Sequence, residues 1–332
     1  MAKFLFIVIF CLLTFSVPAQ EAQDLHENAK TFMRQNDYAN ASLILVRVLK
    51  MDPSNLSVAK DLAFSYYFQN DFDKGLKVLA PFLDNNTADD QSYQIAGLIY
   101  KRTANLKEAD KIYKKALKNF PKSGPLYNDY GELLWATQDN NAIKIWEKGI
   151  QEDPGFGTNY YNASKYYFSN KNKIWSLLYG EIFVNIESYT ARSAEMKNLL
   201  LEGYKKLFLE TDLLRDVKDK NAFELAYLTT MNRQNSVVQR GISPESLVMI
   251  RTRFILDWNK DYATKFPFQL FELHNTLLTQ GLFQAYNQWM FGSVQNLSAY
   301  QNWVASYKEE YAAFSDFQKR NIFRMPEGQY YH

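Results

Sequence analysis

Small side chains recur every 34 residues along the first half of the chain, with a single step of 33 residues. They form two parallel series: Ala29, Ala63, Gly97 and Gly131, then Ala41, Gly75, Ala109 and Ala142. If Ala and Gly fill about one position in seven, small residues at all of these positions are improbable by chance. Two antiparallel helices approach to about 8–10 Å only where small side chains face each other. The spacing therefore predicts consecutive two-helix units that stack side by side.

Turn and stop signals fall at fixed places within these units. A short polar turn separates the two helices of a unit at residues 36–38, 70–72 and 104–106. Three units end at a proline, and Thr87 stands where the second unit would have one; the prolines are Pro53, Pro121 and Pro154. Because the residue before a proline avoids helical dihedrals, these prolines predict the end of the second helix.

The segments Asn36–Pro53 and Lys107–Pro121 resemble the second half of a tetratricopeptide repeat (TPR). The resemblance places five repeats, the last of them the weakest, at about 22–55, 56–89, 90–123, 124–156 and 157–188. It implies an all-α fold, a TPR-like helical-hairpin solenoid that winds as a right-handed superhelix. It covers roughly half of the chain after residue 19, and it indicates the fold more specifically than the function.

From residue 189 to residue 332 the 34-residue period fades, but helical patterns continue. They predict a helix at Ser193–Leu209, a helix that starts at Ser243-Pro244-Glu245, a hairpin of 267–279 and 283–291 that turns at Gly281, and a last helix at Ser298–Phe317. This helical region is either a set of divergent repeats or a separate domain. In both cases it would cap the stack, whose last repeat otherwise exposes an apolar face.

The first residues have the pattern of a secretory signal peptide. Lys3 precedes an apolar run at Phe4–Phe15, and Val17 and Ala19 supply the small residues expected before a cut at Gln20. The run is shorter than the about 20 apolar residues that span a membrane. The pattern therefore predicts a signal peptide at 1–19, export to the periplasm or the medium, and a mature chain without a membrane span. The single cysteine, Cys11, lies within the signal, so no disulfide is expected.

Motifs for catalysis, metal binding and nucleic-acid binding are mostly absent from the sequence. His26, His274 and His332 lie far apart, and neither a Gly-rich phosphate loop nor a Gly-x-Ser-x-Gly elbow occurs. After residue 19 the chain has 37 basic and 36 acidic residues, a balance that gives no long-range attraction for nucleic acid. We therefore expect a non-catalytic protein that holds no metal or cofactor.

In TPR proteins the first helix of each repeat lines the concave face, through the second, fifth, ninth, twelfth and thirteenth positions of the repeat. At these positions the resemblance implies a partner-binding groove made by His26, Lys30, Arg34, Lys60, Phe64, Tyr67, Phe68, Lys101, Arg102, Asn128, Glu132, Trp135, Tyr161, Lys165 and Phe168. Basic groups that alternate with aromatic rings suit an extended acidic or aromatic peptide. The clamp of Lys, Asn and Arg that some family members use for a terminal carboxylate is not matched, because Asp61 and Ile95 stand where it needs donors.

Three functions are compatible with these features, and we favour the first, an exported scaffold for a protein or peptide partner. The second is a glycan-binding protein of the cell envelope, whose exposed tryptophans would stack on sugar rings; the candidates are Trp135, Trp289 and Trp303. The third is an enzyme with a C-terminal site, for which the candidate cluster is Arg251, Arg253, Asp257 and His274.

Overall fold

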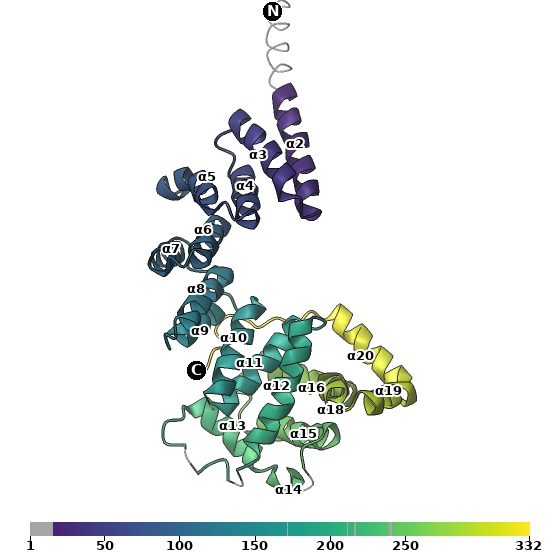
Figure 1. Ribbon diagram of the computed structural model, residues 1–332. Helices are drawn as coiled ribbons and strands as arrows, with labels where there is room; N and C mark the ends of the chain where they lie inside the picture. Colours follow the sequence, from purple (N-terminus) through teal and green to yellow (C-terminus); the bar gives the residue numbers. More distant parts are fainter. Residues whose placement is uncertain (1–15, 171, 211, 216, 239–240) are drawn as a thin grey trace, which may run out of the picture. The chain divides into compact units, whose positions relative to one another are not determined.

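The computed structural model describes residues 16–332 except 171, 211, 216 and 239–240, and the side chains from Gln20 onward (Figure 1). The apolar run of the predicted signal peptide, Phe4–Phe15, lies outside the described residues. The described residues form helices joined by turns, and they contain no strand. The all-α, helical-hairpin fold that the sequence predicts is therefore confirmed.

Each of the five predicted repeats contains two helices (Figure 1). In chain order the pairs are α2 (Ser16–Arg34) and α3 (Tyr38–Met51), α4 (Leu56–Phe68) and α5 (Phe72–Asp84), α6 (Asp90–Arg102) and α7 (Leu106–Asn119), α8 (Gly124–Ala136) and α9 (Ala142–Glu152), and α10 (Gly157–Ser169) and α11 (Lys173–Ile186). The observed ends of these helices follow the turn and proline signals of the sequence closely.

The turn inside each of the first four repeats contains one residue with a left-handed backbone, at Asn36, Asn70, Ala104 and Gln138, with φ between 54° and 60°. Asparagine tolerates this conformation better than most residues, because its short side chain can bond locally. After the turn, Asp37 caps α3 by accepting a hydrogen bond from the backbone of Asn40. These local preferences fix where one helix stops and the next begins.

The recurring small residues lie where helices touch. Ala29, Ala41 and Ala63 are fully buried. A Cβ atom added to Gly75 would lie 2.9 Å from Ile99 Cδ1 and 3.2 Å from the backbone oxygen of Ala63. The helices of this region therefore pack too closely for a larger residue, which is the physical reason for the spacing that the sequence displays.

The contacts divide the chain into two compact units, residues 1–139 and 140–332. The division falls inside the fourth predicted repeat, whereas the sequence suggested a boundary at 188/189. Within the second unit, α12 (Ala191–Leu207) packs directly on α11. Two glycines permit this close approach. A Cβ atom added to Gly180 would lie 2.9 Å from Met196 Sδ, and one added to Gly203 would lie 2.9 Å from Leu177 Cδ2. The repeat packing thus continues past residue 189 without a break.

Beyond α12 most of the helices are short and less regular, with the exception of the 18-residue α15. They are α13 (Ala222–Asn232), α14 (Asn235–Val238), α15 (Pro244–Asp261), α16 (Gln269–Thr279), α17 (Phe283–Asn287), the π-helix η1 (Gln288–Gly292), α18 (Ser293–Gln295), α19 (Leu297–Ser306) and α20 (Lys308–Arg320). The predicted helix start at Ser243 and the turn at Gly281, with φ of 73°, are confirmed. The prediction of one last helix over Ser298–Phe317 is wrong, because the helix is interrupted at Tyr307, between α19 and α20.

After α20 the chain runs extended, and its last residues pack back on the earlier helices of the second unit (Figure 1). The ring of Tyr331 stacks on Phe223 of α13, with centroids 4.7 Å apart. His332 contacts the Tyr167 hydroxyl of α10 at 3.0 Å and the Glu147 carboxylate of α9 at 3.1 Å. This C-terminal segment therefore contributes side chains to the core of the second unit.

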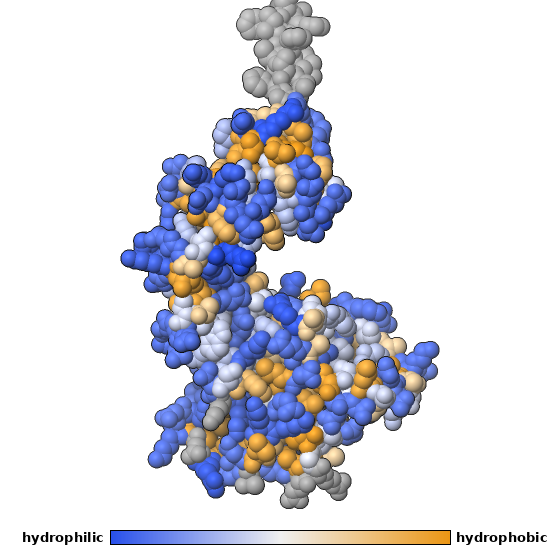
Figure 2. Space-filling view, in the orientation of Figure 1, coloured by the Kyte–Doolittle hydropathy of each residue, from blue (hydrophilic) through white to orange (hydrophobic). Residues whose placement is uncertain are grey.

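No helix among the described residues is long and apolar enough to cross a membrane. On the face that Figure 2 shows, hydrophilic residues predominate over the helices of the first unit, and hydrophobic patches on the second unit are interrupted by hydrophilic residues.

Candidate binding groove

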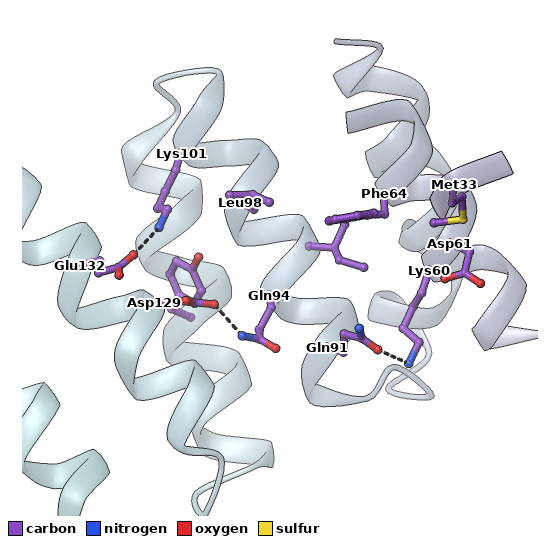
Figure 3. A pocket seen from close by; sticks show the side chains of 12 residues that line it. Met33, Lys60, Asp61, Phe64, Gln91, Gln94, Leu98, Lys101, Asp129 and Glu132 are labelled. Atoms are coloured by element: carbon purple, nitrogen blue, oxygen red, sulfur yellow. Dashed lines mark hydrogen bonds and ion pairs between the residues drawn. The ribbon is translucent and has the colours of Figure 1, made fainter. Parts of the chain in front are cut away.

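A pocket of about 410 Å³ opens on the first unit, along the first helices of its repeats (Figure 3). Its lining side chains come from α2, α4, α6 and α8, together with one residue from α7. They are Met33, Lys60, Asp61, Phe64, Gln91, Gln94, Ile95, Leu98, Lys101, Tyr113, Asp129 and Glu132. The volume lies within the range of about 300–1,000 Å³ that is usual for ligand pockets. We call this pocket the α4–α6–α8 groove.

The groove brings together some of the predicted site residues and not others. Lys60, Phe64, Lys101 and Glu132 line it. The other predicted residues of the first unit lie outside its lining: His26, Lys30, Arg34, Tyr67, Phe68, Arg102, Asn128 and Trp135. Phe68 is 46% exposed and stacks on Tyr38, with ring centroids 4.4 Å apart, so it remains available at the surface of the same helix.

The predicted residues of the fifth repeat belong to the second unit, where they contact neighbouring side chains. Tyr161 and Lys165 both bind the carboxylate of Glu195, at 2.6 and 2.8 Å. The ring of Phe168 lies 3.7 Å from the ammonium group of Lys206. These three side chains therefore tie α10 to α12.

Polar bonds link the first helix of one repeat to that of the next. His26 bonds Asp61 at 2.6 Å, Gln94 bonds Asp129 at 2.8 Å, and Lys101 contacts Glu132 at 3.5 Å. Lys60 likewise reaches across to Asp89, at 2.5 Å, and to Gln91, at 2.8 Å. The lysines that the sequence suggested as contacts for a partner thus have acidic neighbours already.

The lining of the groove has no excess of positive charge for an acidic peptide, and the expectation of an extended acidic or aromatic peptide stays a prediction. The lining has two lysines and three acidic residues, Asp61, Asp129 and Glu132. The positions that line the concave face in TPR proteins selected both lysines and Glu132, but they did not select Asp61, which follows Lys60 directly, or Asp129 of α8. The groove combines a slight excess of acidic groups with an apolar wall made by Met33, Phe64 and Leu98 (Figure 3).

Asp129 and Tyr113 form the most unusual part of the groove. Burial raises the pKa of the Asp129 carboxyl, although the Gln94 amide and the Lys101 ammonium act in the opposite direction. Tyr113 is fully buried, and its hydroxyl has no hydrogen-bond partner. Burial and the charges of Asp129 and Glu132 raise the pKa of this hydroxyl, so it stays protonated.

Gly97 explains how a residue of a second helix reaches the groove. A Cβ atom on Gly97 would lie 2.3 Å from Cζ and 2.5 Å from Oη of Tyr113. The Tyr113 ring thus passes directly over α6, and only glycine leaves room for it there. The sequence offered one signal for this contact, because Gly97 belongs to the recurring series of small residues, but nothing in that series identified the tyrosine.

The residues suggested for an enzyme do not form a site that is open to a substrate. Arg251 and His274 are 2% and 3% exposed, and both bind the buried carboxylate of Glu181, which no sequence pattern revealed. Arg253 is exposed on the same helix, and Asp257 accepts a hydrogen bond from Gln234 instead. The buried cluster therefore has a structural explanation.

The tryptophans suggested for a glycan site differ in their exposure. Trp135 is 46% exposed, whereas Trp289 is 4% exposed and cannot stack on a sugar ring in this conformation. Trp303 is half-buried and stacks on Tyr307, with centroids 5.0 Å apart. Within the part of the chain that the structure describes, no group of three or more His, Cys, Asp or Glu side chains is arranged to hold a metal ion.

Consecutive helix pairs, with small residues at their contacts, define a helical-repeat protein. More particularly, the chain is a tetratricopeptide repeat protein, and the sequence model of that repeat matches residues 91–123. This family consists generally of non-catalytic scaffolds for protein interactions.

The chain is also similar to several individual proteins. A TPR-containing protein of Dictyostelium discoideum is 36% identical over 72 residues, which span 21% of this chain and only 6% of that protein. Among solved structures, a thermophilic TPR protein of Thermus thermophilus is 14% identical with a TM-score of 0.45, covering 54% of this chain and 99% of its own. A tetratricopeptide repeat protein from Parabacteroides merdae is 14% identical with a TM-score of 0.42. The match covers 73% of this chain and 92% of that protein. YrrB, described as a TPR protein with an unusual peptide-binding site, is 15% identical with a TM-score of 0.38. The match covers 52% of this chain and 90% of YrrB.

Proposed function

We propose that this protein is an exported, non-catalytic TPR scaffold that binds an extended segment of a protein partner in the α4–α6–α8 groove. The observation that carries the proposal is the groove itself, a pocket of about 410 Å³ on the first helices of consecutive repeats. It joins an apolar wall to several polar groups, which is the usual composition of a specific binding site.

Phe64 is the wall residue best suited to a test of the groove. It is half-buried and lines the pocket, and a partner side chain packed on its ring would remove further apolar area from water. Phe68 lies one helical turn further along α4, but its ring contacts that of Phe64, with centroids 4.8 Å apart, so it is not an independent control. Leu43 of α3 serves as the control, because it is a large apolar side chain of the first unit that is 72% exposed and lies outside the lining.

A phage-displayed library of random peptides, selected on the purified protein, tests the proposal. We expect enriched peptides to bind Phe64→Ala at least about tenfold more weakly than the unaltered protein, because truncation of a buried aromatic contact in an interface commonly costs that much or more. Binding to Leu43→Ala should stay within about twofold. Failure to enrich any peptide, or equal loss in both variants, would contradict a peptide-binding role for the groove.

Export is supported by the charged and apolar pattern of residues 1–19. The expected mature protein begins at Gln20, and N-terminal sequencing of the protein recovered from the cell envelope or the medium measures this directly. Recovery of the chain with Met1 intact from the cytosol would contradict the export proposal and leave the groove proposal standing.

A further inference from the structure

Residues 329–332, which we call the strap, are held on the second unit as a short peptide is held by its receptor (Figure 1). The strap lies outside the helices, after the end of α20. The Tyr331 ring stacks on Phe223 of α13, with centroids 4.7 Å apart, and the Asn221 side chain donates to the Tyr331 backbone oxygen at 2.7 Å. The Gln329 side chain accepts a hydrogen bond from the first backbone N–H of α16 at 2.6 Å. Side-chain contacts therefore hold the strap in place of a helical ladder.

Glu147 of α9 forms the polar end of this site. It is 7% exposed, and its carboxylate accepts hydrogen bonds from the hydroxyls of Tyr167 at 2.7 Å and Tyr179 at 3.3 Å. The imidazole of His332 contacts the same carboxylate at 3.1 Å and the Tyr167 hydroxyl at 3.0 Å. The two hydroxyls are neutral donors, whereas an imidazole can also carry a positive charge. Because a buried carboxylate is costly without a cationic partner, the site favours a basic or imidazole group beside Glu147.

The strap can leave this site without the unfolding of a helix. The residues beneath it are buried, with Phe223 at 2% and Trp175 at 1% exposure, whereas the side chains of the strap are half-buried or exposed. Residues 326–328, which precede the strap, are exposed, and Gly328 has a left-handed backbone with φ of 83°. A segment with few buried contacts opens at a lower free energy than the core does. Its opening exposes an aromatic surface beside a buried carboxylate.

We propose that the strap is a removable occupant of a second peptide site, which also takes an extended partner segment in which a histidine, lysine or arginine follows an aromatic residue. The aromatic ring of such a segment stacks on Phe223 in the place of Tyr331, and its basic group meets Glu147 in the place of His332. The strap competes with the partner, so the observed affinity is reduced by the fraction of molecules in which the site is open. This autoinhibited site lies within the second unit and goes beyond the role proposed for the α4–α6–α8 groove.

A shortened chain that lacks residues 329–332 provides the first test. The probe is a fluorescein-labelled peptide with the sequence of residues 326–332, and its fluorescence anisotropy reports binding. We expect saturable binding to the shortened chain and at least about tenfold weaker binding to the unaltered protein, whose site is occupied. Tyr331→Ala in the peptide should weaken binding to the shortened chain about tenfold or more, because an aromatic contact is lost. Absence of binding to a shortened chain that keeps its helical circular dichroism, or equal binding to both chains, would overturn the inference.

A full-length variant covers the case in which the shortened chain does not fold. Tyr331→Ala in the protein removes the ring of the strap from the site and keeps the chain length, so the labelled peptide should bind this variant more tightly than the unaltered protein, by about tenfold. Addition of Glu147→Gln should weaken the peptide. Addition of Glu152→Gln, on the same helix but bonded to Lys148 at 2.7 Å, should leave its affinity unchanged. Equal affinities of the unaltered and Tyr331→Ala proteins, or equal effects of the two glutamine substitutions, would contradict the proposed site.

Phage-displayed peptides selected on the Tyr331→Ala protein test the chemistry of the partner. Those that compete with the labelled peptide should carry an aromatic residue followed by histidine, lysine or arginine. Their affinity should not change when Phe64→Ala is added, because Phe64 lines the groove of the first unit. This independence separates the two sites, so that either proposal can fail alone. Competing peptides with Asp or Glu after the aromatic residue, or the absence of any competing peptide, would overturn the chemistry assigned to the second site.

Discussion

At the scale of single residues, the second unit is organised around the buried carboxylate of Glu181. Arg251 bonds it directly, and His274 and the Tyr286 hydroxyl reach it at 2.8 and 2.7 Å. Burial alone would raise the pKa of Glu181, but the charges of Arg251 and His274 lower it to about 2. Arg251 also donates to Asn287 at 2.5 Å. The carboxylate thus fastens α11 to α15, α16 and α17.

Because Glu181 and Arg251 are both buried, an apolar substitution at one of them should lower the free energy of unfolding more than apolar substitutions at both. We expect Arg251→Met to lower the free energy of unfolding by about 3–5 kcal/mol, since it leaves the Glu181 charge buried and unpaired. Glu181→Leu should be similarly destabilising, and the double variant should be less destabilised than the sum of the two. Urea unfolding followed by tryptophan fluorescence measures all three variants, and strictly additive losses would contradict this account of the pair.

At the scale of elements, the π-helix η1 interrupts the second helix of the predicted 267–291 hairpin. The Lys197 ammonium of α12 donates to the backbone oxygen of Trp289 at 3.0 Å and lies 3.6 Å from the centroid of its ring. A side chain that inserts into a helical ladder is a common cause of such an irregularity. Burial lowers the pKa of Lys197 to about 7, because the charged ammonium group is disfavoured away from water. The hydrogen bond to Trp289 therefore comes from a lysine whose charged form is destabilised.

The lowered pKa of Lys197 makes the stability of the second unit depend on pH. Between pH 7 and about 10.5 the unfolded chain binds the proton more strongly than the folded one, so the free energy of unfolding should rise with pH, by at most about 1.4 kcal/mol per pH unit. Lys197→Met should lack this component. Lys205→Met, on the same helix but half-exposed, should retain it. Chemical unfolding at a series of pH values measures the slopes, and equal slopes in Lys197→Met and the unaltered protein would contradict the assignment.

At the scale of the whole molecule, residues far apart in sequence complete the second unit. Tyr331 accepts a hydrogen bond from Asn221 at its backbone oxygen, at 2.7 Å, and its own hydroxyl donates to the backbone of Pro267, also at 2.7 Å. Its ring stacks on Phe223, and the ring centroid of His332 lies 5.1 Å from that of Trp175. The C-terminal segment therefore helps to hold α10, α11 and α13 in one core.

Loss of the Tyr331 ring should destabilise the second unit selectively. We expect Tyr331→Ala to lower its free energy of unfolding by about 1–3 kcal/mol, because a half-buried ring and its hydrogen bond are removed. Hydrogen exchange measured by mass spectrometry should show lower protection around Phe223 and unchanged protection in residues 20–139. Ile322→Ala, at a site 75% exposed in the same segment, should change stability by less than about 0.5 kcal/mol. Equal effects of the two substitutions would contradict a packing role for Tyr331.

The helical hairpins of residues 22–188 could be predicted from the sequence, because the signals involved are local. A left-handed Asn36, a capping Asp37 and small residues at a fixed spacing each act within one repeat or between a helix and its immediate neighbour. Of the positions that the TPR resemblance selected on the first helices, Lys60, Phe64, Lys101 and Glu132 line one pocket.

The charges that surround these side chains depend instead on contacts between packed helices. Lys60 meets Asp89, which caps α6, and Lys101 meets Glu132 of the following repeat. A rule that assigns positions within a single helix does not identify such pairs. Tyr113 reaches the groove from a second helix, and Glu181 meets Arg251 across 70 residues of sequence. Such contacts depend on the distance between packed helices, which no local pattern records. For this reason the fold could be read from its period, while the chemistry of the groove could not.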